Sequence, residues 1–285
     1  MTFEYWFTLP VALVFATIAM ASGVGGATFF APFFMLVLRL PPEIAIGTGL
    51  ITEVFGFASG LYAYSHKKLI DYKLGITLLS VTVPLALIGT WASGMVEANV
   101  LKAIFGMGLF AIAASFLRAP ESKEITLLDE HIEKEYGAEK AETCITTRDQ
   151  EKICYTVCNK NQGRIIAGIG GLFVGMISTG LGELNGYFLL QRCRVPSAVS
   201  VATSVFVVAV TALVASLGHF YKFTTYGGAV LHTVFSIVIF TVPGVIIGAQ
   251  FGSFLSRKIP KHQLEKGLGL LFFFIAALTI GEIVL

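Results

Sequence analysis

Long apolar blocks set the first constraint on this chain. Apart from two interrupted runs, six stretches each hold about twenty or more mostly apolar residues, the length that a helix needs to cross a bilayer core of about 30 Å. They cover residues 43–64, 73–96, 100–118, 197–220, 228–256 and 262–285. Charged residues make up only 13% of the 285 residues, against about 25% in soluble domains. The sequence predicts an all-α polytopic membrane protein, since the alternating pattern of a β-barrel strand is missing.

The remaining composition and motifs exclude several classes of protein. The formal net charge of +2 is too small to indicate a nucleic-acid partner. The chain contains no phosphate-binding loop, no His-Glu-x-x-His and no Gly-x-Ser-x-Gly motif. We therefore expect no enzyme activity, no cofactor and no resident metal. The first apolar run follows Met1-Thr2-Phe3-Glu4, which lacks the basic residues of a signal peptide, so we expect it to belong to the fold.

Glycine pairs interrupt two apolar runs, residues 7–38 and 165–191, near their middle. The interruptions read Ser22-Gly23-Val24-Gly25-Gly26 and Thr179-Gly180-Leu181-Gly182-Glu183. Such glycines break a helix, and the freed N–H and C=O groups are tolerated at membrane depth only inside the protein or along a cavity. One break alone is explained by close helix packing through small residues. A matched pair, one in each half, is typical of a transporter's binding site.

The two halves of the chain repeat one another. Residues 41–48 align with 196–203 at an offset of 155, and Pro84 and Gly89 align with Pro243 and Gly248 at an offset of 159. Small differences between such offsets are expected from short loop insertions. We therefore predict a first transmembrane repeat over 1–118, a linker loop over 119–163 and a second transmembrane repeat over 164–285.

The charged loops indicate how the interrupted runs cross the bilayer. If each run is a single crossing, Lys and Arg residues are spread almost evenly over both sides. If each run is a re-entrant hairpin, one side holds the central loop with Lys67, Lys68, Lys73, Arg192, Arg194, Arg257, Lys258, Lys261 and Lys266, and the other only Arg39, Lys102 and Lys222. The positive-inside rule favours the second arrangement, with the basic side in the cytoplasm. One hairpin and three crossings per half then predict inverted repeats in the plasma membrane.

The two breaks also predict where a ligand binds. Half-helices that begin there offer free N–H groups and a partial positive charge, which favour an anion. Nearby hydroxyl and amide groups add donors, as do the matched positions 48 and 203–204. The candidate substrate-binding residues are Ser22, Gly23, Gly25, Gly26, Thr28, Thr48, Ser178, Thr179, Gly180, Gly182, Asn185, Thr203 and Ser204. For Thr48 and Thr203, a hydroxyl bonded to the carbonyl of its own helix is about as good an explanation.

Two carboxylates, Glu53 and Glu183, lie within the predicted membrane segments. Ionisable residues at that depth are costly and usually functional. Because an apolar environment favours the protonated form of a carboxyl, such a group suits proton binding and release. We expect Glu53 to carry a coupling proton. For Glu183, proton handling and the capping of exposed amides at the broken helix are equally good explanations.

The central loop, 119–163, contains a predicted amphipathic helix over 121–142 and a predicted strand over 153–158. Three of the four cysteines, Cys144, Cys154 and Cys158, lie in this loop. The spacing of the cysteines does not require a disulfide framework. With His131 the three loop cysteines offer four possible metal ligands, but the spacing matches no standard zinc pattern, so we expect no metal there.

The sequence resembles the sulfite exporter TauE/SafE family of membrane transporters over essentially its whole length. In the first half the resemblance rests on Gly23-Val24-Gly25-Gly26-Ala27, Pro32 and Ala45-Ile46-Gly47-Thr48-Gly49, and in the second on the stretch from Gly170 to Glu183 and on Ala202-Thr203-Ser204. A Thr-Ser pair common in the family reads Thr48-Gly49 here, which removes one hydroxyl from the implied site. The resemblance implies a secondary carrier for small sulfur-containing or organic anions, such as sulfite, sulfonates or sulfoacetate.

Taken together, the sequence predicts a proton-coupled secondary transporter of such an anion, which works by alternating access in the lipid bilayer as a monomer or homodimer. Two alternatives stay open. One is a carrier coupled to sodium or a metal ion, held by Glu183 and unwound backbone carbonyls. The other is a membrane redox protein that handles sulfur compounds through Cys144, Cys154 and Cys158.

Overall fold

The computed structural model describes residues 3–22, 27–118, 127, 130, 143–255 and 261–284. Six helices in this part of the chain are long and apolar enough to cross a membrane. They are α3 (Pro42–His66), α4 (Tyr72–Ser93), α5 (Ala98–Leu117), α9 (Ser197–Tyr226), α10 (Gly228–Leu255) and α11 (Lys261–Val284). Their positions agree closely with the six predicted spans, which confirms a helical membrane protein with six candidate spanning helices.

The two interrupted runs form pairs of shorter helices. The first run gives α1 (Thr8–Ser22), after the 3-10 turn η1 (Phe3–Tyr5), and then α2 (Ala27–Leu36). Residues 23–26 between them lie outside the described residues. The second run gives α7 (Lys160–Ile177), α8 (Leu181–Gly186) and the π-helix η2 (Tyr187–Arg192). The predicted interruption of the second run is therefore confirmed.

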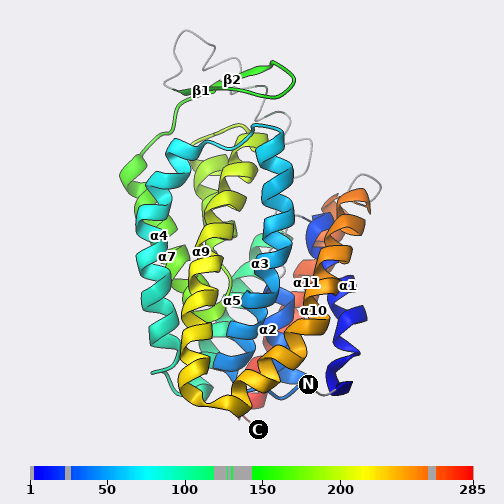
Figure 1. Ribbon diagram of the computed structural model, residues 1–285. Helices are drawn as coiled ribbons and strands as arrows, with labels where there is room; N and C mark the ends of the chain where they lie inside the picture. Colours follow the sequence, from blue (N-terminus) through cyan, green and yellow to red (C-terminus); the bar gives the residue numbers. More distant parts are fainter. Residues whose placement is uncertain are drawn as a thin grey trace.

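The helices form a bundle with α3 and α9 at its centre (Figure 1). Helices α4 and α7 stand on one side of this pair, and α1, α10 and α11 on the other. Both chain termini lie at one end of the bundle, and the small β-hairpin lies at the opposite end. Large apolar side chains such as Ile76, Trp91, Phe251 and Phe274 are exposed on the outside, as expected for a surface that faces lipid tails.

Glycines allow the closest helix pairs. On α7, a Cβ added at Gly171 would lie 2.6 Å from the carbonyl oxygen of Thr82, and one at Gly175 would meet the carbonyl oxygen of Ala86, both on α4. Residue numbers rise together along this contact, so α4 and α7 run parallel. In the same way Gly244 of α10 meets the Leu9 carbonyl of α1, and Gly248 meets the carbonyl of Leu13. Only residues without a side chain let two backbones approach so closely.

A two-stranded hairpin follows the part of the linker that lies outside the described residues. Strands β1 (Thr143–Thr146) and β2 (Lys152–Tyr155) pair antiparallel, so the predicted strand is confirmed as far as Tyr155. The helix predicted over 121–142 lies almost wholly outside the described residues. Tyr155 anchors the hairpin, because its buried hydroxyl donates to Asp71 Oδ2 at 2.6 Å and Asp71 caps the start of α4. Burial, together with this carboxylate, raises the pKa of Tyr155.

All four cysteines form disulfides, which the sequence analysis did not predict. Cys144 pairs with Cys154 across the β-hairpin, and Cys158 pairs with Cys193 over a separation of 35 residues. The second pairing joins Cys158, two residues before the start of α7, to the residue directly after η2. The second interrupted run therefore starts and finishes at the same end of the bundle. Spacing along the chain could not reveal this pair, because only folding brings its cysteines together.

Candidate functional site

The second break is a left-handed turn between α7 and α8. The backbone φ is 61° at Ser178 and 104° at Gly180. At Gly180 a side chain would be strained, so this position requires glycine. The N–H of Ser178 donates to the Val174 carbonyl at 2.9 Å and ends α7. Helix α8 then starts at Leu181, so its N-terminal end lies at the break.

The first turn of α2 contacts the second break through hydroxyl groups. Thr28, in the first turn of α2, has its Oγ1 3.1 Å from Oγ1 of Thr179, and both residues are buried. The N-terminal end of α2 and the break before α8 therefore meet inside the protein. The predicted site residues Gly23, Gly25 and Gly26 lie outside the described residues, as does the side chain of Ser22.

Two buried polar side chains beside the second break have one atom each without a hydrogen-bond partner in the described part of the chain. They are Ser178, at Oγ, and Asn185, at Nδ2; Asn185 is 1% exposed. An unsatisfied buried donor or acceptor costs about 1–3 kcal/mol, so such a group in a folded protein calls for an explanation, such as a ligand or a water molecule. The amide nitrogen only donates, and the hydroxyl donates or accepts. The site thus suits a ligand rich in acceptor atoms.

Glu183 lies in the first turn of α8. Its carboxylate interacts by hydrogen bonding with the backbone N–H of Gly180 and with its own N–H. The first N–H groups of a helix lack intrahelical partners, and a carboxylate there satisfies them and complements the helix dipole. This contact is the capping role, one of the two explanations that the sequence offered for Glu183.

Glu53 lies within α3 and is 4% exposed. Its neighbour Thr52 has Oγ1 3.0 Å from Oγ1 of Thr241 on α10. A second hydroxyl pair joins Thr82 of α4 to Thr211 of α9 at 2.9 Å. Each pair connects a helix of the first half of the chain with one of the second. These pairs were not predicted from the sequence, although a repeated Thr-Val-Pro at 82–84 and 241–243 is a signal that points to them.

The remaining predicted site residues have other contacts. Thr48 donates to the carbonyl of Ile44 in its own helix at 2.6 Å, the alternative given above for this residue. Thr203 accepts a hydrogen bond from the backbone N–H of Asp71 at 3.0 Å and so supports the start of α4. Ser204 is buried in α9, and a Cβ at Gly182 would lie 3.9 Å from the side chain of Val208. Among the described residues, the Thr48 and Thr203 hydroxyls bond to Ile44 and Asp71 and not to the second break.

A polar cluster ties three helices together at the end that carries the chain termini. Glu43 of α3 forms an ion pair with Lys222 of α9, and the hydroxyl of Tyr226 donates to the same carboxylate at 2.8 Å. Lys222 also donates to the carbonyl of Thr90 on α4 at 3.1 Å. At the opposite end, the contacts of Asp71 with Tyr155 and Thr203 join α4, α9 and the β-hairpin. Both ends of the central helices are therefore held by buried or half-buried polar contacts.

His219 is a buried residue that the sequence analysis did not place in the site. It lies on α9, and its Nε2 is 2.9 Å from the carbonyl oxygen of Gly175 on α7. Because a carbonyl only accepts, Nε2 carries the proton of this bond. This histidine therefore fastens α9 to the helix that leads into the second break.

The described ranges contain no group of three or more His, Cys, Asp or Glu residues placed to hold a metal ion. Cys144, Cys154 and Cys158 are oxidised in disulfides, and a disulfide sulfur is not the thiolate that binds zinc. His131, the fourth ligand considered, lies outside the described residues.

Six candidate spanning helices, with two interrupted runs that meet at buried hydroxyls, place the protein in the class of polytopic membrane transporters. The family model described as sulfite exporter TauE/SafE matches residues 8–279, and the chain belongs to this family. The chain is 23% identical over 280 residues to the probable membrane transporter protein YunE of Bacillus subtilis (strain 168), an alignment that covers 95% of this chain and 96% of that protein. No solved structure matches the chain.

Proposed function

We propose that this membrane transporter is a secondary carrier that moves a small sulfur-containing or organic anion across the plasma membrane by alternating access. The observation that carries the proposal is the buried contact between Thr28 and Thr179, which joins the start of α2 in the first half to the break before α8 in the second. Ser178 and Asn185 add a buried hydroxyl and a buried amide donor. Helices α2 and α8 both begin at this place, and helix N-termini favour negative charge.

The proposed donors are neutral, which suits an oxyanion such as sulfite or a sulfonate. Its oxygens accept hydrogen bonds from hydroxyl and amide groups, and no fixed positive charge holds the anion so tightly that release is slow. A counterflow screen of sulfite, thiosulfate, sulfonates and carboxylates, with purified protein in proteoliposomes, tests this class. We expect uptake of a sulfur oxyanion or a sulfonate.

A substitution at Asn185 locates the site in the same assay. Asn185→Asp places a carboxylate among the proposed donors, and we expect it to abolish uptake by repelling the anion. Asn161→Asp makes the same change at an exposed position near the start of α7 and is the matched control, with uptake retained. Equal uptake by the Asn185→Asp variant and the control would place the anion elsewhere.

We propose that transport is coupled to protons through Glu53, which is buried within α3. Glu53→Gln cannot take up a proton, so we expect uptake to lose its dependence on pH. Glu183→Gln keeps an acceptor for the N–H of Gly180, so the pH dependence is expected to persist there. Unchanged pH dependence in Glu53→Gln would remove this assignment. Dependence of transport on sodium would instead favour the cation-coupled alternative.

The proposed carrier consists of two inverted repeats, with 119–163 as the linker. In support, α1 packs on α10 as α7 packs on α4. Leu13 meets Gly248 and Leu172 meets Gly89, and both the two leucines and the two glycines are separated by the same offset of 159. The hydroxyl pairs agree with this, since Thr82 corresponds to Thr241 at the same offset and each bonds to a threonine of a central helix in the other half, Thr211 and Thr52. In Figure 1 the first interrupted run starts at the end with the termini and the second at the end with the β-hairpin.

We propose that the β-hairpin end faces the cytoplasm, because most Lys and Arg residues of the loops are at that end. The two disulfides there favour the opposite orientation, since stable disulfides are typical of oxidising compartments. Single cysteines at the exposed positions Lys67 and Glu97, introduced after the native cysteines are replaced by serine, decide between the two. We expect a membrane-impermeant maleimide on intact cells to label Glu97→Cys and not Lys67→Cys.

A further inference from the structure

We propose that the disulfide Cys158–Cys193 is a thiol–disulfide exchange site whose state controls the second interrupted run and, through it, the rate of transport. The control of transport rests on the function proposed above, and the exchange itself rests on the cytoplasmic placement of the β-hairpin end. The reactant is a dithiol, free or carried by a protein, because the cytoplasm keeps thiols reduced by such compounds.

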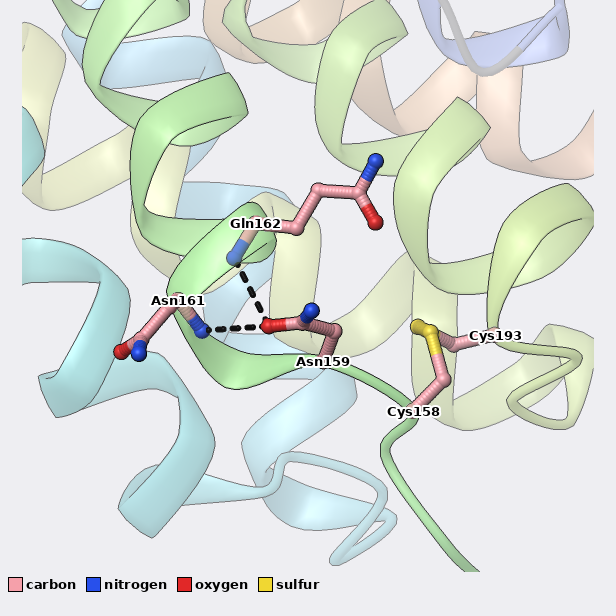
Figure 2. The surroundings of a disulfide bond; sticks show 5 residues. All are labelled: Cys158, Asn159, Asn161, Gln162 and Cys193. Atoms are coloured by element: carbon pink, nitrogen blue, oxygen red, sulfur yellow. Dashed lines mark hydrogen bonds between the residues drawn. A yellow bond between two sulfur atoms is a disulfide. The ribbon is translucent and has the colours of Figure 1, made fainter.

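The disulfide connects the two ends of the second interrupted run. Cys158 lies between β2 and α7, and Cys193 directly follows η2. Their Cα atoms are 5.0 Å apart although 35 residues separate them in sequence. The bond therefore closes a covalent ring around both arms of the run, α7 as the inward arm and α8 with η2 as the return arm. Figure 2 shows the two sulfur atoms beside the start of α7.

The ends of the two arms beside the disulfide differ in their hydrogen bonds. The inward arm has its own cap, since Asn159 Oδ1 accepts from the backbone N–H groups of Asn161 and Gln162 at 3.1 Å each (Figure 2). The return arm ends in a π-helix, a rare element that is frequent at functional sites. Its final bond, from Cys193 N–H to the Phe188 carbonyl at 2.9 Å, stays within the arm. The disulfide is thus the covalent restraint that fixes the return arm to the inward arm.

The return arm carries residues of the proposed anion site. Asn185, with its buried amide, lies two residues before the start of η2, and the Gly180 turn precedes the arm. Alternating access requires the walls of the site to rearrange, so a closed ring around both arms slows this step. Reduction opens the ring at one end of the segment and lets the return arm open more readily.

The exchange balances with a dithiol as the reductant. Cys158 is exposed and Cys193 is buried, so a thiolate of the reductant attacks the sulfur of Cys158. The S–S bond breaks, and the sulfur of Cys193 leaves as a thiolate and takes a proton. The second thiol of the reductant then attacks the mixed disulfide, which frees Cys158 as a thiol and leaves the reductant as a disulfide. Two electrons and two protons pass to the protein.

The other disulfide provides a matched control. Cys144–Cys154 joins two residues that already face each other across β1 and β2, with a separation of 10 residues. It lies within the β-hairpin and encloses neither arm of the interrupted run. Cys144→Ser/Cys154→Ser therefore removes the same chemistry at the same end of the bundle without opening the ring.

Hydrogen–deuterium exchange on the full-length protein tests the restraint without any assumption about the substrate. After complete reduction by a dithiol, verified by the mass gained on thiol alkylation, we expect amides of residues 181–193 to exchange several-fold faster. The same response is expected in Cys144→Ser/Cys154→Ser, whereas Cys158→Ser/Cys193→Ser is expected to exchange fast with and without reductant. An unchanged wild-type protein, or an equal response in Cys158→Ser/Cys193→Ser, overturns the proposal.

Counterflow in proteoliposomes tests the control of transport. We expect a several-fold faster rate after reduction of the wild type and of the control variant, and no response in Cys158→Ser/Cys193→Ser. A rate that stays constant or falls on reduction of the wild type overturns the regulatory role. Labelling that places the β-hairpin end outside the cell overturns the exchange. A faster amide exchange without transport of any anion overturns the proposed function and supports the exchange site.

Discussion

At the scale of single residues, the threonines show that one type of side chain makes different contacts in different places. The hydroxyl of Thr28 contacts Thr179 at the meeting of the two breaks, whereas the hydroxyl of Thr48 bonds to its own helix. Thr203 supports the start of α4 by accepting from Asp71. Their sequence neighbourhoods alone gave these residues similar standing as site candidates, and only their contacts distinguish them.

A comparison of two valine substitutions tests this distinction. We expect Thr28→Val to raise the KM for the anion about fivefold, because a net contribution of about 1 kcal/mol is typical of one hydrogen bond. Thr48→Val, with the same change in volume and shape, should leave KM within about twofold, since its hydroxyl serves an intrahelical bond. Equal effects of the two substitutions in the proteoliposome assay would contradict the assignment of Thr28.

Tyr155 permits a second prediction at this scale. Its raised pKa keeps the phenol protonated, so the bond to Asp71 is fully present below the ordinary tyrosine pKa of about 10 and is lost only as the pH passes the raised value. We expect Tyr155→Phe to lower the free energy of unfolding by about 1.5–3 kcal/mol at neutral pH, because it removes a hydrogen bond to a charged group. Thermal unfolding in detergent measures this, with the exposed Tyr221→Phe as a control that should not change.

At the scale of elements, glycine stripes fix the two closest helix pairs. A methyl group at Gly175 would meet the backbone of α4 at Ala86 and Thr90. Backbone atoms cannot rotate away as a side chain does, so the helices have to separate. Side chains at Gly244 and Gly248 would likewise meet backbone atoms of α1 and push α1 and α10 apart.

Alanine at such a glycine is expected to destabilise its helix pair. We predict that Gly175→Ala lowers the free energy of unfolding by about 1–3 kcal/mol through overpacking. Gly281→Ala, on α11 where nothing lies within 4 Å, should be neutral or raise it by up to about 1 kcal/mol, because alanine is the better helix former. The midpoint of thermal unfolding in detergent separates these outcomes, and equal loss in both variants would argue against close packing as the cause.

The elements were largely predictable from the sequence, and several contacts were not. Apolar length predicted the six spans, and Gly180 and Gly182 marked the second break, because bilayer thickness and backbone freedom act locally. The pairing of Cys158 with Cys193 and the bond between Thr52 and Thr241 depend on segments far apart in the chain. The spacing of the cysteines holds no trace of their pairing, and the repeated Thr-Val-Pro marks matching positions without showing which residues they contact. For the same reason the sequence did not separate the contacts of Thr28 from those of Thr203.

At the scale of the whole molecule, the polar clusters at the two ends define what has to open in a transport cycle. Access from the end with the termini requires α3, α4 and α9 to part, and the ion pair of Glu43 with Lys222 opposes this. Partly buried pairs of this kind, with an extra hydrogen bond from Tyr226, are more effective than exposed ion pairs.

Loss of this ion pair is expected to open that end of the molecule. We predict that Glu43→Gln increases the rate at which a maleimide labels a cysteine placed at Ser93, a residue that is 1% exposed next to the cluster. Glu97→Gln removes an exposed carboxylate at the same end and should leave the labelling rate unchanged. Slower or equal labelling in Glu43→Gln would show that the cluster does not hold this end closed.

The packing of α1 on α10 also has a consequence for the synthesis and membrane insertion of the protein. Thr17 bonds to the Gly248 carbonyl, a residue 231 positions later in the chain. At about 5–20 residues per second, α1 waits roughly 10–50 s for its partner to be synthesised. During that interval its glycine-facing stripe is open to lipid or to chaperones of the insertion machinery. The first half of the chain is therefore expected to mature only after the second has entered the membrane.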